Sequence, residues 1–324
     1  RFMYVQLNGF KSKQFLQETG VPQGSVLGPL LFNIFINDIV DVVDVQSLLF
    51  VDDLKIYSII NSASDSIRLQ NNIDKVFDWC SRNNLLINKL KCFVMTFTKK
   101  TKPILFDYIM GDIVLTRPDT IRDLGITFDP KMSFAMHIGN ITQAAFKSLG
   151  FILRNGREFD DVETLKSLYI ACVRSHLEYN SLVWSPLYNV YISMLERIQR
   201  RFLKSAAFML DGTYPPRGYP QEMLLDRFNL SSLASRRIVH SIIFLFKVIH
   251  GLQECPVILF NIRFKINRPN ARIKNTFYLP ASRTDIGLAS PLFQMLQNYT
   301  YIENQLDIFN CTIVDIKRRF EHPT

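Results

Sequence analysis

Cysteine is scarce in this chain of 324 residues, and the cysteines that it has form no pattern. Their number is odd, no pair has the Cys-x-x-Cys spacing, and they are scattered at Cys80, Cys92, Cys172, Cys255 and Cys311. This distribution argues against a zinc site and against a disulfide framework. It suits a reducing compartment, and we expect the protein to be intracellular, in the cytoplasm and nucleus.

Long apolar runs are absent as well. The longest stretch, Ile238 to Ile249, is interrupted by His240, Ser241 and Lys247, whereas a membrane-spanning helix needs about 20 apolar residues. We therefore expect neither a membrane segment nor a signal peptide. The chain opens on Arg1 rather than on methionine, within strand-like sequence, which leads us to expect an amino-terminally truncated fragment.

Basic residues outnumber acidic ones, and the net charge of the whole chain is +9. The imbalance lies in the second part of the chain. Residues 1–128 contain 14 Lys and Arg against 13 Asp and Glu, whereas residues 129–324 contain 24 against 16. This surplus favours a polyanionic partner for the second part, the alternative being a basic surface that is simply solvated. A length of 324 residues is enough for two or three packed units, and the hydrophobic fraction of 48% indicates a globular protein with a core.

The first part of the chain is predicted to be rich in strands. Asn8-Gly9 is a hairpin turn signal between two short strands. Pro29 can begin a helix that is apolar on almost every side as far as Val43, which is typical of a buried helix. Residues 64–82 have the pattern of an amphipathic helix that ends at Asn83-Asn84. Further strands are expected at residues 48–51, 54–57, 85–88, 92–98, 113–115 and 121–128.

After Pro130 the pattern becomes helical. The helix predicted over 188–209 carries large apolar residues on one stripe and its arginines on the other faces. The stretch from Tyr214 to Pro220 is typical of a linker, and residues 255–291 show little periodicity. The other helices are expected at about 132–154, 161–180, 232–250, 291–300 and 311–321.

Two adjacent carboxylates, Asp52 and Asp53, stand between two short apolar runs. This pattern predicts a hairpin with the acids at or beside its turn. Carboxylates suit Mg²⁺, which prefers oxygen ligands, and two such ions can stabilise the attacking and leaving oxygens of nucleotidyl transfer. Because successive strand residues point to opposite faces, we expect only one of the two acids to bind metal directly, and we favour Asp52. The alternative is an ordinary polar turn.

A glycine-rich loop precedes the acidic pair by the length of one helix and one strand. It runs Gly20-Val21-Pro22-Gln23-Gly24-Ser25-Val26-Leu27-Gly28-Pro29. Gly24 and Gly28 are expected to leave the backbone open to a nucleotide or a template base, and Gln23 offers donors and an acceptor. Alternatively, the loop is a structural turn before a buried helix. Its spacing from Asp52 predicts that both motifs lie at one end of a sheet, as in a polymerase palm.

These motifs resemble those of reverse transcriptases from non-LTR retrotransposons of the LINE type, in particular the jockey-like elements of insects. The stretches that carry the resemblance are Gly20–Phe32 with Ile36–Ile39, Phe50–Asp53, Leu86–Cys92, Leu124–Ile126, Leu177–Tyr179 with Trp184–Pro186, and Leu195–Arg201. They extend over most of the chain, and the first is the most specific. Group II intron maturases and telomerase share the acidic hairpin, but the long glycine-loop run points away from both.

The resemblance implies an RNA-directed DNA polymerase that extends a DNA primer on an RNA template with deoxynucleoside triphosphates and Mg²⁺. It assigns catalysis and metal binding to Asp52 and Asp53. It assigns protonation of the leaving pyrophosphate to Lys91, which could otherwise be an ordinary surface lysine. The residues implied at the nucleotide and template are Pro22, Gln23, Gly24, Ser25, Phe50 and Val51, with Val51 replacing a more usual alanine. The primer grip would be Leu124 and Gly125, and nucleic acid would contact Arg197, Arg200, Arg201 and Lys204.

The resemblance also implies an α+β fold in three parts. These are a partial palm over 1–128, made of an antiparallel sheet with packed helices, a helical thumb over 129–210, and a basic, irregular to helical extension over 211–324. A palm of this family has another aspartate on a strand well before the glycine loop, whereas the only acid before Gly20 is Glu18. We therefore expect this chain to be inactive alone. The alternatives are a nucleic-acid-binding remnant without catalysis and a decayed copy without function.

Overall fold

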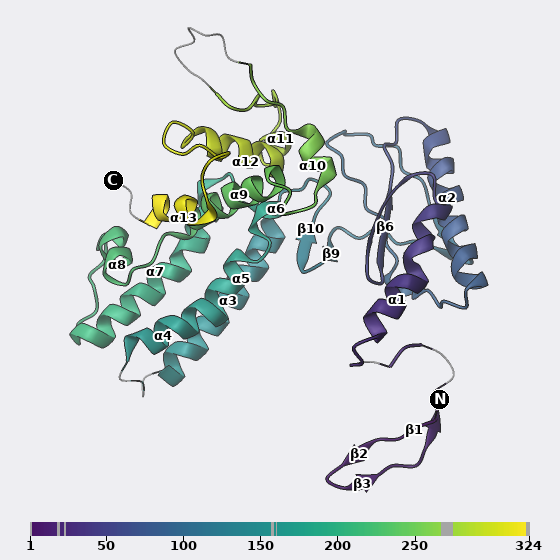
Figure 1. Ribbon diagram of the computed structural model, residues 1–324, viewed down its shortest axis with the longest axis horizontal. Helices are drawn as coiled ribbons and strands as arrows, with labels where there is room; N and C mark the ends of the chain where they lie inside the picture. Colours follow the sequence, from purple (N-terminus) through teal and green to yellow (C-terminus); the bar gives the residue numbers. More distant parts are fainter. Residues whose placement is uncertain are drawn as a thin grey trace. The chain divides into compact units, whose positions relative to one another are not determined.

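The computed structural model describes residues 2–17, 20–22, 24–156, 159, 161–266 and 275–321. Helices alternate with short antiparallel hairpins, so the fold is α+β, as the sequence predicts. The chain forms two compact units, residues 1–118 and residues 119–324 (Figure 1). None of the described helices combines the length and the apolar character needed to cross a lipid bilayer.

The first unit opens on a hairpin of four two-residue strands. β1 (Phe2–Met3) pairs with β4 (Phe15–Leu16), and β2 (Gln6–Leu7) pairs with β3 (Phe10–Lys11). Asn8 and Gly9 form the turn with φ angles of 48° and 83°, the conformation that an Asn-Gly pair favours. The predicted hairpin is confirmed, although the ladder is interrupted where the Val5 amide donates to the Ser12 hydroxyl.

The helix after the glycine loop departs from prediction. α1 (Gly28–Ile36) is followed by a 3-10 helix, η1 (Asn37–Val42), so the expected continuous helix breaks into two. Only Gly28 and Ile36 of α1 are buried, and four of its large side chains are exposed, namely Leu30, Leu31, Ile34 and Phe35. The prediction of a helix buried on every side is wrong for the described residues. An apolar pattern states how a helix could pack, but not which of its faces meets a neighbour.

An acidic hairpin and a long helix complete the first core. The hairpin consists of β5 (Gln46–Phe50) and β6 (Asp53–Tyr57), and α2 (Ala63–Arg82) follows it. A capping box between Ser62 and Asp65 begins α2 by pairing amide groups that the first turn leaves free. The hairpin residues Leu49 and Leu54 pack on a cluster formed by Ile36, Ile39, Val76, Trp79 and Cys80. The predicted hairpin and the predicted amphipathic helix are both confirmed.

Two strands predicted after α2, at residues 85–88 and 92–98, do not form. Residues 89–91 make a 3-10 turn, η2 (Lys89–Lys91), and Phe93 makes an isolated bridge to Thr116. β7 (Ile109–Met110) and β8 (Ile113–Val114) pair as a short hairpin. All the sheets among the described residues have two strands, so separate hairpins stand where we expected one palm sheet. Short apolar runs predict extended backbone, but pairing depends on a suitable neighbouring edge.

The second unit begins with the hairpin of β9 (Ile121–Asp123) and β10 (Ile126–Phe128). Its larger core joins α3 (Ala135–Asn155), α4 (Val162–Tyr169) and α7 (Asn189–Asp211), which lie side by side in Figure 1. Tyr169 stacks on Phe202 with ring centroids 4.1 Å apart. The helix predicted over 161–180 is interrupted by a π-helical turn, η4 (Ile170–Arg174), before α5 (Ser175–Glu178).

A smaller core follows in the same unit. It joins α9 (Leu233–Ile249), α12 (Pro291–Thr300) and α13 (Ile313–Glu321). These three helices and the helices α3 and α7 confirm the predictions to within a few residues, and residues 214–220 form neither helix nor strand, as expected of a linker. The unpredicted helices are α6 (Ser181–Trp184), α8 (Gln221–Arg227), α10 (Pro256–Asn261) and α11 (Asp285–Leu288). Each is too short for its apolar spacing to be recognised.

Candidate active site

Asp52 and Asp53 lie at the end of the β5–β6 hairpin. Phe50 pairs with Asp53, so Val51 and Asp52 form a two-residue turn. Both carboxylates are exposed, and neither forms an ion pair with another described residue. The hairpin therefore presents two acidic side chains to solvent, and no cation of the described residues is paired with either of them.

Val51 gives this turn an uncommon backbone conformation. Its φ is 56°, a value that β-branched residues rarely adopt because the side chain crowds the backbone. The side chain is 47% exposed, so burial of Val51 provides little compensation. Strain of about 1–3 kcal/mol is often found at functional sites, and here it lies beside two exposed carboxylates.

The two acids fit a hard divalent cation by their chemistry. Mg²⁺ takes oxygen ligands, keeps several waters, and is commonly bound through one or two carboxylates. Within the described ranges, no three Asp, Glu, His or Cys side chains converge as a metal site. Because both carboxylates are exposed, Asp52 and Asp53 could supply part of a ligand set for Mg²⁺.

The glycine loop is stabilised by its own hydrogen bonds. Ser25 Oγ donates to the Pro22 carbonyl at 2.8 Å and accepts from the Gly28 amide at 3.0 Å. Gly28 is buried, and an added Cβ would lie 2.8 Å from Ser25 Oγ, so our expectation that Gly28 leaves open backbone is wrong. Gly24, with a φ of 81°, has open space beside it. Gln23 lies outside the described residues.

The loop and the acidic hairpin are linked through one core. Phe32, on the helix that follows the loop, and Leu49, on the strand that precedes the acids, pack against the same buried cluster. α1 and β5 are thus both attached to η1 and α2. This shared packing holds the helix after the glycine loop in a fixed position relative to the two carboxylates. The side chains that do so are apolar and are not candidate catalytic residues.

Lys91 is exposed, on the 3-10 turn η2 rather than on the edge of a strand. The neighbouring Lys89 is different, because its ammonium pairs with Asp112 and lies over the Phe77 ring. Lys91 has no such partner among the described residues, so its side chain remains available for another role.

The predicted primer-grip residues form the turn between β9 and β10. Leu124 and Gly125 both have positive φ, at 42° and 85°, which defines a tight two-residue hairpin turn. The Tyr179 hydroxyl donates to the Leu124 carbonyl at 3.2 Å. An added Cβ on Gly125 would lie 2.9 Å from Cε1 of Tyr179, so the turn requires glycine both for its backbone and for its contact with this ring.

Comparison with known proteins places these motifs in a family. A family model described as "Reverse transcriptase (RNA-dependent DNA polymerase)" matches residues 1–153, which contain the glycine loop, the acidic hairpin and the Leu124-Gly125 turn. The chain is 34% identical, over 156 residues, to the RNA-directed DNA polymerase from mobile element jockey of Drosophila melanogaster. It is 26% identical, over 217 residues, to a probable RNA-directed DNA polymerase from transposon BS of the same species.

Residues 1–153 match the reverse transcriptase family, and both relatives are polymerases of mobile elements. The match to the jockey polymerase covers 44% of the chain and 17% of that protein, and the match to the transposon BS polymerase covers 63% and 24%. The chain thus spans about a quarter or less of the length of these curated relatives. No solved structure matches it significantly.

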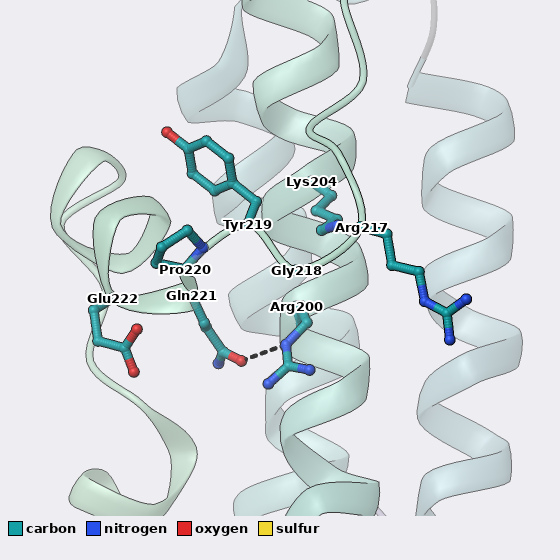
Figure 2. A pocket seen from close by; sticks show the side chains of 8 residues that line it. All are labelled: Arg200, Lys204, Arg217, Gly218, Tyr219, Pro220, Gln221 and Glu222. Carbon is teal, nitrogen blue, oxygen red and sulfur yellow. Dashed lines mark hydrogen bonds between the residues drawn. The ribbon is translucent and has the colours of Figure 1, made fainter.

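The four basic residues singled out on α7, which follows the matched segment, have different surroundings. Arg197, Arg200 and Arg201 are exposed, and Lys204 is half-buried. The Arg201 guanidinium lies 4.6 Å from the centre of the Phe146 ring. Lys204 donates its ammonium protons to two carbonyl groups of the linker, so its most evident role is to attach that linker to α7. Figure 2 shows Lys204 and Arg200 beside the linker.

A buried charge cluster in the second unit was not recognised from the sequence as a functional or structural group. Glu178 on α5 accepts hydrogen bonds from the Arg236 guanidinium of α9 and lies 3.7 Å from Nε of Arg174. The side chains of Arg174 and Glu178 are only 14% and 13% exposed. Glu178 belongs to the Leu177–Tyr179 stretch that supported the family resemblance, but no spacing rule connects it with a residue 58 positions away.

Proposed function

We propose that this chain is the part of an RNA-directed DNA polymerase that carries the acidic hairpin, and that the polymerase extends a DNA primer on an RNA template. The observation that carries the proposal is the exposed pair Asp52 and Asp53, one on the two-residue turn and one at the start of β6, within the segment that matches the reverse transcriptase model. Carboxylates at the end of a rigid hairpin can position a divalent ion at a reacting phosphate.

In this proposal Asp52 and Asp53 bind Mg²⁺, which when bound stabilises negative charge on the attacking and leaving oxygens. Lys91 donates a proton to the departing pyrophosphate. The open backbone at Gly24, with Phe50 and Val51, contacts the incoming nucleotide and the template. The Leu124-Gly125 turn contacts the primer strand, and the basic second unit contacts the phosphate backbone.

Primer extension tests this function. The chain alone is expected to be inactive, because it contains the acidic pair but no candidate for the third palm carboxylate before the glycine loop. Fusion to the amino-terminal segment of the jockey polymerase should produce RNA-templated extension in Mg²⁺. Asp52→Asn should abolish it, whereas Asp74→Asn, an exposed acid on α2, should not. An active fusion that is indifferent to Asp52→Asn contradicts the proposal.

A second candidate function is nucleic-acid binding without catalysis. The surplus of basic residues after residue 128 favours it. Filter binding of RNA or DNA should weaken steeply with salt, since phosphate contacts release counterions. Binding that is absent, or that does not respond to salt, would exclude this role.

A further inference from the structure

A basic pocket lies where the linker crosses α7 in the second unit. It has a volume of about 390 Å³ and lies between α7, the end of the linker and the start of α8 (Figure 2). The residues that matter for its chemistry are Arg200, Lys204, Arg217, Gly218, Gln221 and Glu222. Three cationic side chains against one carboxylate make the pocket a candidate for an anionic ligand.

The wall of the pocket is fixed by a tight turn. The Tyr219 amide donates to the Pro216 carbonyl at 3.2 Å, and Gly218 between them has a φ of 87°, which is the glycine position of a type II turn. Lys204 donates to the carbonyls of Pro215 and Pro216 at 3.3 and 2.8 Å. These bonds fix the path of the backbone, and the space above Gly218 is open.

One cation of the pocket is held in place by two hydrogen bonds in series. Arg200 Nε donates to Gln221 Oε1 at 2.8 Å, and Gln221 Nε2 donates to Glu196 Oε2 at 3.1 Å. This leaves both terminal nitrogens of Arg200 without a hydrogen-bond partner in the described part of the chain. A guanidinium oriented in this way can offer paired N–H groups to two oxygens of one ligand.

Arg217 provides the second available cation. It occupies the second position of the turn, is exposed, and pairs with no other described side chain. In Figure 2 its side chain points away from Gln221, so the side chain must turn back toward α7 to contact a ligand held by Arg200. Two unengaged guanidinium groups and a lysine suit the tetrahedral oxygens of a phosphate better than a single carboxylate.

The pocket also continues a row of basic residues. The basic residues of α7 recur at spacings of three and four residues, which places them on neighbouring turns of the helix. The row begins at Arg197, continues through Arg200 and Arg201, and ends at Lys204. A ligand with one phosphate would use only the pocket, whereas a strand with many phosphates would use the whole row. The row therefore favours a polyanion with regularly spaced phosphates.

We propose that this pocket binds one internal phosphate of a nucleic-acid strand that runs along α7. The inference deepens the nucleic-acid binding proposed above and rests on it. The ammonium of Lys204 holds the linker and adds positive charge. Arg200, oriented by Gln221, donates its terminal N–H groups to the phosphate. Arg217 contacts the phosphate from the solvent side.

The proposal is tested by measuring how a short labelled RNA binds to the full chain. Fluorescence anisotropy gives the affinity, in EDTA and at salt concentrations from about 50 to about 200 mM. Arg200→Gln and Arg217→Gln should each weaken binding about tenfold, the size expected for a lost charged hydrogen bond. Each should also reduce the slope of log affinity against log salt by about 0.7. The matched control is Arg283→Gln, which removes an exposed arginine outside the pocket and should change affinity less than twofold.

The outcomes separate this pocket from the wider function. If the unmodified chain binds no RNA, the proposed nucleic-acid binding itself fails. If it binds RNA but Arg217→Gln behaves like Arg283→Gln, only the pocket is overturned; this variant stays decisive even if Arg200→Gln loosens α8. Displacement of the RNA by sodium phosphate is compared with displacement by sodium chloride of equal ionic strength. If phosphate is far more effective with the unmodified chain but not with Arg217→Gln, the pocket is a site for free phosphate. If Arg217→Gln loses binding to polyglutamate while its binding to RNA is unchanged, the pocket is a site for an acidic peptide. Either result overturns the proposal.

Discussion

The Tyr179 ring and the Gly125 backbone are in direct contact across 54 positions of the sequence. The tyrosine hydroxyl donates to the carbonyl of the adjacent Leu124 at 3.2 Å, and its ring leaves no room for a side chain on Gly125. The turn of the predicted primer grip is thereby attached to the helical part of the same unit.

Gly125→Ala should destabilise the second unit by more than the cost of a left-handed backbone alone, which is about 1–2 kcal/mol. Gly212→Ala provides the matched control, because Gly212 has a φ of 66° but nothing within 4 Å of an added Cβ. Urea unfolding should show the larger loss for Gly125→Ala. In a Tyr179→Ala background the two substitutions should become equal, and a difference that persists there would contradict the contact.

Val51→Gly should stabilise the first unit slightly. Glycine removes the strain of a positive φ at Val51, about 1–2 kcal/mol, against an entropic cost of about 0.5–1 kcal/mol. Val26→Gly is the control, because Val26 is 94% exposed and is not among the positive-φ residues, so only the entropic cost applies there. A thermal melt in which both variants lose equal stability would mean that the turn is not strained.

Glu178→Ala should be among the more damaging single changes in the second unit. Removing one partner from a buried ion cluster leaves Arg174 and Arg236 uncompensated, at a cost of about 3–5 kcal/mol. Lys75→Ala, which removes an exposed partner of Asp44, should have little effect. The measurement is the free energy of unfolding of both variants. Equal losses would show that the Glu178 cluster contributes no more than a surface pair.

Acidification should weaken the second unit before the carboxylates titrate. Burial lowers the pKa of His137 and of His240 below the ordinary value of 6.5, in His137 helped by Arg122 and in His240 opposed by Glu178. His240 also faces Arg236, Arg174 and Lys317, which lower its pKa further. The unfolded chain therefore binds more protons, and stability is lost as pH falls below about 6.5.

The test is the slope of unfolding free energy against pH between about 7 and 5. His137→Asn keeps an acceptor for the Thr127 amide, which donates to Nδ1 of His137 at 3.3 Å, but cannot titrate. Its slope should be shallower than that of the unmodified chain, and shallower again with His240→Asn. Identical slopes in all three proteins would contradict the assignment.

Much of the local structure could be predicted because its causes are local. The Asn8-Gly9 turn, the start of α2 at Ser62 and the β5–β6 hairpin follow from turn chemistry, capping and short apolar runs. The long helices α3, α7 and α9 were recognisable because apolar residues recur along them often enough to define a face. The position of the carboxylates at the hairpin end was also predictable from local sequence, because a polar pair between two short apolar runs is typical of a turn.

What the amino-acid order could not determine is which surfaces meet. The exposed faces of α1, the failure of residues 92–98 to pair as a strand, and the Tyr179, Glu178 and Arg217 environments all depend on partners distant along the chain. Hydrophobic patterning specifies that a surface is able to pack, whereas the neighbour is selected by the combined packing of the whole unit. The sequence alone determined the candidate chemistry at Asp52 and Asp53. Only the tertiary structure showed that these acids are exposed and form no ion pair with another described residue, and that a linker and a helix line a basic pocket.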